Sequence, residues 1–139
     1  MKELWTCPKC GRKFEKNNQL HSCNFFLLNK HFENRELAKN LFKKLKKDIH
    51  KYVGPFKIES LPCCIHLVST FTFAAVYALK DRIRIHFTLD HRLESYRIDK
   101  CFHVSTNRYS YSIDIENEKE IDEELIRWLK QAYNLRKKR

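Results

Sequence analysis

The chain has little glycine and little proline, with 2 Gly and 3 Pro among 139 residues. Glycine-rich phosphate loops, collagen-like repeats and long flexible linkers all need more of these residues. The chain also lacks an apolar run of the about 18 to 20 residues that a membrane-spanning helix needs. Its first ten residues, MKELWTCPKC, lack the apolar stretch of a signal peptide. We therefore expect a cytoplasmic protein without a P-loop and without membrane association.

Positive charge is concentrated at the two ends of the chain, and the formal net charge is +11. Residues 1–54 hold 13 Lys and Arg against 5 Asp and Glu, and residues 130–139 hold 5 against none. Residues 55–129 are slightly acidic, with 10 against 12. A basic excess of this size attracts polyanions by releasing their counterions. The alternative is a charged surface that serves solubility alone.

Two segments have the apolar spacing of amphipathic helices. In the first, residues 34–53, apolar residues recur every three or four positions, with Asn34 as the expected N-cap and Gly54 just after the helix end. The second segment starts at the expected cap Asp122 and ends in a basic tail. Its expected buried stripe comprises Leu125, Trp128, Leu129, Ala132 and Tyr133.

Between these helices, residues 56–115 alternate polar and apolar side chains with a period of two. Six runs rich in β-branched and aromatic residues predict about six strands, which we expect to form an antiparallel meander. In residues 82–89, Ile83, Ile85 and Phe87 alternate with polar residues, so only one face of the sheet is expected to be covered. The expected fold class is α+β, with this sheet flanked by an N-terminal and a C-terminal helix.

The strongest chemical signal is the segment WTCPKCGRKFEKNNQLHSC near the N-terminus. It places Cys7 and Cys10 in a CPxCG turn and adds His21 and Cys23 after ten further residues. A CxxC turn directs two thiolates at one ion, and the following glycine permits the tight turn. Three cysteines and one histidine complete a tetrahedral site around Zn²⁺ with no open position, so we expect a structural ion. A redox CxxC and unliganded thiols are the alternatives.

The remaining cysteines, Cys63, Cys64 and Cys101, fall in the strand patterns. There we expect them to be buried as small apolar side chains, so they do not extend the metal site. The chain is therefore expected to divide into a zinc knuckle, residues 1–28, and an α+β domain, residues 29–139.

Segments spread along nearly the whole chain resemble the DUF5655 family. They are the head elements WTCPKCGRKF and NNQLHSC, then HFENRELAKNLFKKL, GPFKIE, FTFAAVYALKDRIRIHFTL and IDEELIRWLKQAY. The resemblance implies a short cysteine-rich head joined to a compact α+β domain. It implies a metal site at Cys7, Cys10, His21 and Cys23, and it brings no catalytic residue. The α+β domain also loosely resembles the MmcQ/YjbR-like group of predicted DNA-binding proteins.

The first functional hypothesis is a small zinc-binding protein that binds nucleic acid or another polyanion in an accessory or regulatory role. Phosphate contacts would come from the knuckle, the first helix, the sheet and the tail. The expected residues are Arg12, Lys13, Lys43, Lys44, Lys47, Arg82, Arg84, Arg136, Lys137, Lys138 and Arg139. His86, with Tyr109 or Tyr111 as a stacking ring, would extend this surface.

Two other classes of function stay open. One is a protein-interaction module with a protein partner. The other is an enzyme in which His66, His86, His91 and His103 converge with Arg84 as acid, base and anion clamp. No nucleophile elbow, paired-carboxylate motif or open metal triad accompanies these histidines. A shared concave pocket favours the enzyme, and a flat basic surface favours nucleic-acid binding.

Overall fold

The computed structural model describes residues 4–6, 8, 13–14 and 27–135, and within these no helix is long and apolar enough to cross a membrane. Near the N-terminus, the short strands β1 (Trp5–Thr6) and β2 (Lys13–Phe14) pair in antiparallel fashion. The rest of the described chain confirms the predicted α+β class, with an antiparallel sheet of six strands and helices. Its elements in chain order are α1 (Leu28–His31), α2 (Glu36–Tyr52), β3 (Lys57–Ser60), β4 (Ile65–Val68), β5 (Thr72–Ala78), β6 (Ile83–Leu89), β7 (Lys100–Ser105), β8 (Arg108–Ile115), the 3₁₀ helix η1 (Glu118–Glu120) and α3 (Glu123–Asn134).

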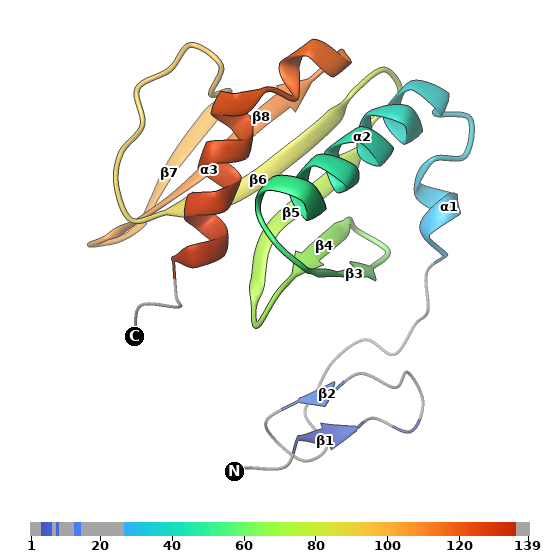
Figure 1. Ribbon diagram of the computed structural model, residues 1–139, viewed down its shortest axis with the longest axis horizontal. Coiled ribbons are helices and arrows are strands. Elements are labelled where there is room, and N and C mark those ends of the chain that lie inside the picture. The colour runs from blue at the N-terminus through green and yellow to red at the C-terminus, as the bar shows by residue number, and fades with distance from the viewer. Residues whose placement is uncertain (1–3, 7, 9–12, 15–26, 136–139) are drawn as a thin grey trace.

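The strand order in the sheet is β3-β4-β5-β6-β8-β7. Strands β3 to β6 follow the chain, but the predicted meander was wrong at its end, because β8 lies between β6 and β7. Burial explains the order: every residue of β7 is exposed, whereas β8 buries Tyr111, Ile113 and Ile115. The strand with large apolar side chains to bury takes the interior position, and the other strand forms the edge (Figure 1).

Helices α2 and α3 cover the same face of the sheet (Figure 1). Strand β6 shows the predicted alternation, with apolar side chains buried under the helices and polar ones half-exposed on the opposite side. The buried residues are Ile83, Ile85, Phe87 and Leu89, and the half-exposed residues are Arg84, His86 and Thr88. We call the first surface the covered face and the second the open face.

The predicted N-cap of α2, Asn34, is a turn residue instead. Its φ is 58°, and the N-cap is Arg35, which makes no side-chain capping bond. Asparagine tolerates left-handed backbone better than most residues, so it suits the bend between α1 and α2. Arg35 reaches the sheet, where its Nη1 donates to the carbonyl oxygen of Ala78 at 2.7 Å. Gly54 follows the helix end as predicted, and a Cβ there would lie 3.0 Å from the Tyr133 hydroxyl oxygen.

Asp122 caps α3 as predicted, accepting a hydrogen bond from the backbone N–H of Leu125 at 3.1 Å. All five residues of the predicted stripe are buried. The connection between β6 and β7 is tied to this helix by Arg97, whose Nη1 lies 2.9 Å from carboxylate oxygens of both Asp122 and Glu124. The Arg97 guanidinium also lies 5.7 Å from the ring centre of Trp128. One partly buried arginine therefore fastens the longest sheet connection to α3.

Candidate functional site

One surface of α2 is a stripe of lysines. Lys39, Lys43, Lys47 and Lys51 follow one another at four-residue intervals, so they lie in a row along the helix. The opposite surface of α2 enters the core through Ala38, Leu41, Phe42, Leu45 and Ile49. Burial of that surface directs the row outward, with Lys39 half-buried and the other three exposed. We call these four residues the lysine stripe.

Lys44, a predicted contact on the same helix, is engaged locally. Its Nζ lies 2.8 Å from Asp48 Oδ2, and this hydrogen bond raises the pKa of Lys44. Lys43 and Lys47, the other predicted contacts on α2, form no ion pair within the part of the chain that the structure describes. The predicted site omitted Lys39 and Lys51, although their four-residue spacing from Lys43 and Lys47 is visible in the sequence.

Arg82 and Arg84, also predicted phosphate contacts, share an acidic partner on the open face. Arg84 Nε donates to Asp114 Oδ1 at 2.7 Å, and Arg82 Nε lies 3.2 Å from Asp114 Oδ2. The hydrogen bond from Arg84 is the main reason that the pKa of Asp114 is below its usual value. The carboxylate offsets part of the positive charge, so this pair attracts phosphate less strongly than the lysine stripe.

The four histidines considered as catalytic residues separate into two groups. His66 and His86 lie on the open face in β4 and β6, with β5 between them. Desolvation, followed by the charge of the neighbouring Arg84, lowers the pKa of His86. His91 lies in the connection after β6. His103 stacks on the ring of Tyr109, with the two ring centres 4.6 Å apart. The side chain of Tyr109 is partly buried and packs on the core. The structure therefore leaves His91 and His103 apart from the open-face pair.

Tyr111 does not offer the stacking surface that the sequence suggested. It alternates with the open-face residues of β8 and is 1% exposed in the covered layer. Its hydroxyl donates to the carbonyl oxygen of His91 at 2.9 Å and accepts from the backbone N–H of Leu93 at 2.7 Å. Burial raises the pKa of Tyr111. Tyr111 therefore anchors the connection after β6 instead of facing a ligand.

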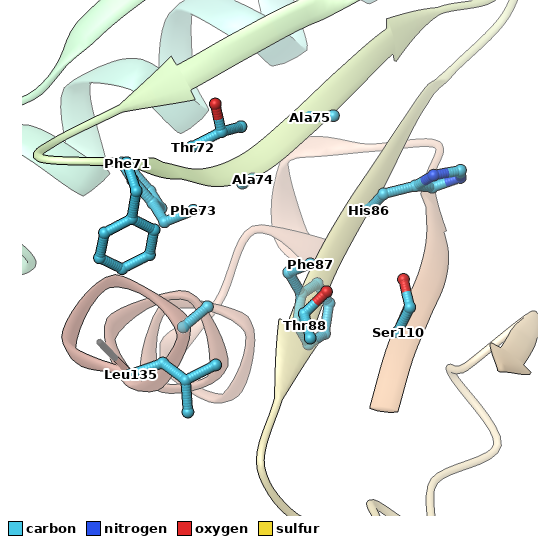
Figure 2. Close-up of a pocket in the computed structure, with 11 residues that line it drawn as sticks. Phe71, Thr72, Phe73, Ala74, Ala75, His86, Phe87, Thr88, Ser110 and Leu135 are labelled. Carbon is cyan, nitrogen blue, oxygen red and sulfur yellow. The ribbon is translucent and has the colours of Figure 1, made fainter. Parts of the chain in front are cut away.

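A small cavity opens where the pairing of β5 with β6 ends (Figure 2). Phe71 and Leu135 lie on one side of it, and Thr88, His86 and Ser110 lie on the other. Its volume is about 180 Å³, below the roughly 300–1,000 Å³ of common ligand pockets. Of the four histidines considered as catalytic residues, His86 alone lines this cavity, so the cavity does not bring the predicted catalytic set together.

Of the three cysteines predicted to be buried in strands, only Cys64 is buried. Cys63 is exposed because it lies in the turn before β4, and Cys101 is exposed because β7 is an edge strand. The Sγ atoms of Cys63 and Cys64 lie 3.1 Å apart.

The predicted zinc ligands, Cys7, Cys10, His21 and Cys23, lie outside the described residues. Arg12 and the tail residues 136–139 lie outside them too, whereas Lys13 is exposed in β2. Among the residues that the structure does describe, no group of three or more His, Cys, Asp and Glu is placed to hold a metal ion.

A family model described as a domain of unknown function (DUF5655) matches residues 28–136. The chain belongs to the DUF5655 family. The matched range of DUF5655 runs from α1 through α3, so it includes the whole sheet and the lysine stripe, while β1 and β2 precede it. No curated protein and no solved structure matches the chain.

Within the DUF5655 domain, the lysine stripe is the feature with the clearest chemistry. Its lysine side chains end in hydrogen-bond donors with no acceptor, and Asp48 and Glu118 line a hollow together with Lys43 and Lys47.

Proposed function

We propose that this DUF5655 protein binds nucleic acid through its phosphates, mainly with the lysine stripe, in an accessory or regulatory role. The observation that carries the proposal is a row of four lysines on the exposed side of a helix whose other side is held in the core. The row spans about 18 Å at 1.5 Å per residue, which is long enough to meet several successive phosphates. Arg12, Lys13 and the tail residues 136–139 supply further contacts in this proposal.

The stripe opposes the stability of its own helix. Like charges four residues apart repel by about 0.2–0.5 kcal/mol per pair, and the stripe contains three such pairs. Solubility alone is served as well by dispersed charges of both signs. A bound polyanion removes the repulsion, so the arrangement is better explained by an anionic partner than by solvation.

Other predicted contacts have a lesser part in the proposal. Asp114 offsets the charge of Arg82 and Arg84, and Asp48 offsets that of Lys44. Lysine ammonium groups on a helix surface contact phosphates but do not read base edges, so we expect little sequence preference. The loose resemblance to the MmcQ/YjbR-like predicted DNA-binding proteins agrees with this proposal.

Two variants with equal loss of charge test the stripe. The stripe variant changes Lys39, Lys43, Lys47 and Lys51 to Gln, which keeps good helix propensity. The control variant changes four exposed lysines elsewhere in the domain to Gln, namely Lys57, Lys80, Lys100 and Lys119. Because both lose the same charge, a difference between them reports position and not net charge. Binding to duplex DNA is measured as a function of salt concentration, from ~50 mM upward.

We expect the slope of log K against log[salt] to become shallower by up to about 3.6 in the stripe variant, or ~0.9 for each lost phosphate contact. The control variant should change it by less than about 1. Equal changes in the two variants contradict the stripe as the binding surface. If the full-length protein retains neither DNA nor RNA at ~50 mM salt, nucleic-acid binding itself is wrong, and the protein-interaction module leads.

The proposal includes a structural zinc ion held by Cys7, Cys10, His21 and Cys23. Its support in the structure is the antiparallel pairing of β1 with β2, because the CPKCGR segment then connects two paired strands. Two cysteines in such a connection, followed by two further ligands, are typical of zinc knuckles and ribbons. With four protein ligands the ion has no open position and would stabilise the N-terminal head.

Elemental analysis of the purified, untagged protein should find one zinc ion per chain. Cys10→Ser should lose it, whereas Cys101→Ser, which changes an exposed cysteine on β7, should keep it. Chelation should unfold the head and spare the DUF5655 domain, because metal binding and folding are coupled only where the ligands lie. Clearly less than one equivalent in the wild type, with no further loss in Cys10→Ser, contradicts the zinc site.

A further inference from the structure

The turn between β3 and β4 holds two adjacent thiols side by side. The backbone N–H of Leu61 donates to the carbonyl oxygen of Cys64 at 2.9 Å, so Pro62 and Cys63 form a tight two-residue turn. The Sγ atoms of Cys63 and Cys64 are 3.1 Å apart. Cys63 is exposed and Cys64 is 2% exposed. One sulfur is therefore open to an incoming ion, and the second lies behind it.

A hollow of about 430 Å³ adjoins this pair, and Cys63 and Tyr77 line it. Cys64 is hydrogen-bonded to the Tyr77 hydroxyl, and burial raises the pKa of the Cys64 thiol to about 11. Lys30 and Arg35 also line the hollow, together with one acid, Glu33. The hollow gives a ligand room to approach, and its net positive charge favours a thiolate there once a ligand displaces the proton.

The separation of the two sulfurs selects among metal ions. At a metal–sulfur distance of ~2.3 Å, the observed 3.1 Å corresponds to an S–metal–S angle of about 85°. Tetrahedral zinc needs a wider angle and four ligands, and the described residues offer no group of three or more. Trivalent arsenic and antimony form pyramidal sites with angles near a right angle, and they favour soft thiolate ligands. The pair therefore fits a trivalent metalloid better than zinc.

A disulfide fits the same two residues less well. Cα atoms joined by a trans peptide are about 3.8 Å apart, below the roughly 4.4–6.8 Å that disulfides usually span. A bond between Cys63 and Cys64 would be strained and easily reduced. A chelated ion leaves the sulfurs near their present separation.

We propose that Cys63 and Cys64 form a chelating dithiol site for a trivalent metalloid such as arsenite. Two S–H bonds and two As–O bonds break as two S–As bonds form, and two water molecules leave. The third hydroxyl stays on arsenic, facing the hollow, and no oxidation state changes. This site is independent of the lysine stripe and of the proposed zinc ion.

Phenylarsine oxide is the probe, because its arsenic forms two bonds to thiols and releases one water. The full-length, zinc-loaded, reduced protein is incubated with it in excess 2-mercaptoethanol, which removes arsenic held by a single thiol. Iodoacetamide then alkylates free cysteines, and trypsin releases residues 58–80, a peptide that contains Cys63, Cys64 and no other cysteine. The readout is alkylation of Cys63.

We expect the probe to protect Cys63 in the wild type and in Cys101→Ser. In Cys64→Ala, protection should need about 10²-fold more probe or more, because the second bond no longer forms within one site. Arsenite added before the probe should protect Cys63 in the same way. Since Cys64 is buried, the exposed Cys63→Ser variant provides a second test, in which mass analysis of the tryptic peptide 58–80 should show no phenylarsine adduct.

Three results overturn the proposal. The first is full alkylation of Cys63 in the wild type with the probe present. The second is unchanged protection in Cys64→Ala, which would mean that a single thiol suffices. The third is an adduct that persists on the peptide 58–80 of Cys63→Ser.

Discussion

The covered and open faces come from alternate residues of the same strands, yet different forces stabilise them. The covered face is one apolar cluster beneath α2 and α3. The open face carries ion pairs of Asp114 with Arg82 and Arg84, all of them partly exposed. Burial of a large apolar side chain contributes about 1.5–3 kcal/mol, and a surface ion pair contributes about 0–1 kcal/mol. Stability should therefore reside in the covered face, which leaves the open face freer to vary.

The largest expected effect on this comparison is that of Trp128→Ala. Trp128 is 6% exposed and stacks on Phe87 of the covered face, with ring centres 6.1 Å apart. Truncation should lower the free energy of unfolding by about 3–5 kcal/mol in urea titrations. Tyr77→Ala, the matched truncation on the open face, should cost less than about 2 kcal/mol, because that ring is only partly buried. A cost below about 1 kcal/mol for Trp128→Ala would place the ring outside the core.

The same substitution at two arginines compares ion pairs associated with the two faces. Arg97 is 10% exposed at its side chain and bonds to Asp122, Glu124 and the carbonyl oxygen of Glu120. Arg84 is 32% exposed and, among the residues that the structure describes, bonds to Asp114 alone. Changing Arg97 to Met should cost about 1–3 kcal/mol of unfolding free energy, and changing Arg84 to Met about 1 kcal/mol or less. If chemical denaturation shows that both variants lose the same unfolding free energy, the greater burial of Arg97 does not make its ion pairs more stabilising than that of Arg84.

Features set by local periodicity could be predicted from the sequence. The alternation of polar and apolar residues around Ile85 predicted the strand and its covered face. The recurrence of apolar residues every three or four positions around Lys43 predicted the helix and its basic side. The cap at Asp122 was also local, since it depends on residues within one turn. These features need no knowledge of distant parts of the chain.

Features that depend on distant contacts could not be predicted. Asp114 pairs with Arg84 from 30 positions away, so the sequence did not show that its carboxylate offsets a predicted phosphate contact. The place of β8 inside the sheet depends on which strand has more apolar side chains to bury. Strand β7 therefore forms the edge of the sheet, and Cys101 on that strand is exposed. Cys63 and Cys64 are visibly adjacent in the sequence, but the hairpin turn decides how their sulfurs lie.

Asp114→Asn should have a smaller effect that depends on pH. The hydrogen bond from Arg84 holds the pKa of Asp114 below its usual value. Its contribution is therefore complete above the unfolded pKa of about 3.9 and is lost as the pH falls through the folded pKa. The variant should be less stable than the wild type by about 1 kcal/mol or less near neutral pH. The difference should shrink in acid, and a difference that grows in acid would contradict the assigned direction.

The smallest expected effect is that of His86→Gln, also on the open face. Desolvation and the charges of Arg84 and Lys100 lower the pKa of His86, while Asp114 acts in the opposite direction. The unfolded chain then binds the proton more readily than the folded one. The wild type should therefore lose stability as the pH falls below the unfolded pKa of about 6.5.

Glutamine does not titrate, so the variant should lose less stability between about pH 7.5 and about pH 5.5, by about 0.5 kcal/mol or less. Part of the loss should remain, because burial lowers the pKa of His31 as well, and that residue lies near the α1–α2 bend, away from His86. Urea midpoints at the two pH values measure the difference. An equal or larger loss in His86→Gln would mean that the open face leaves His86 as easily protonated as it is in the unfolded chain. The two faces would then differ in hydration more than the partly buried position of His86 indicates, since even this open-face residue would behave as fully hydrated surface.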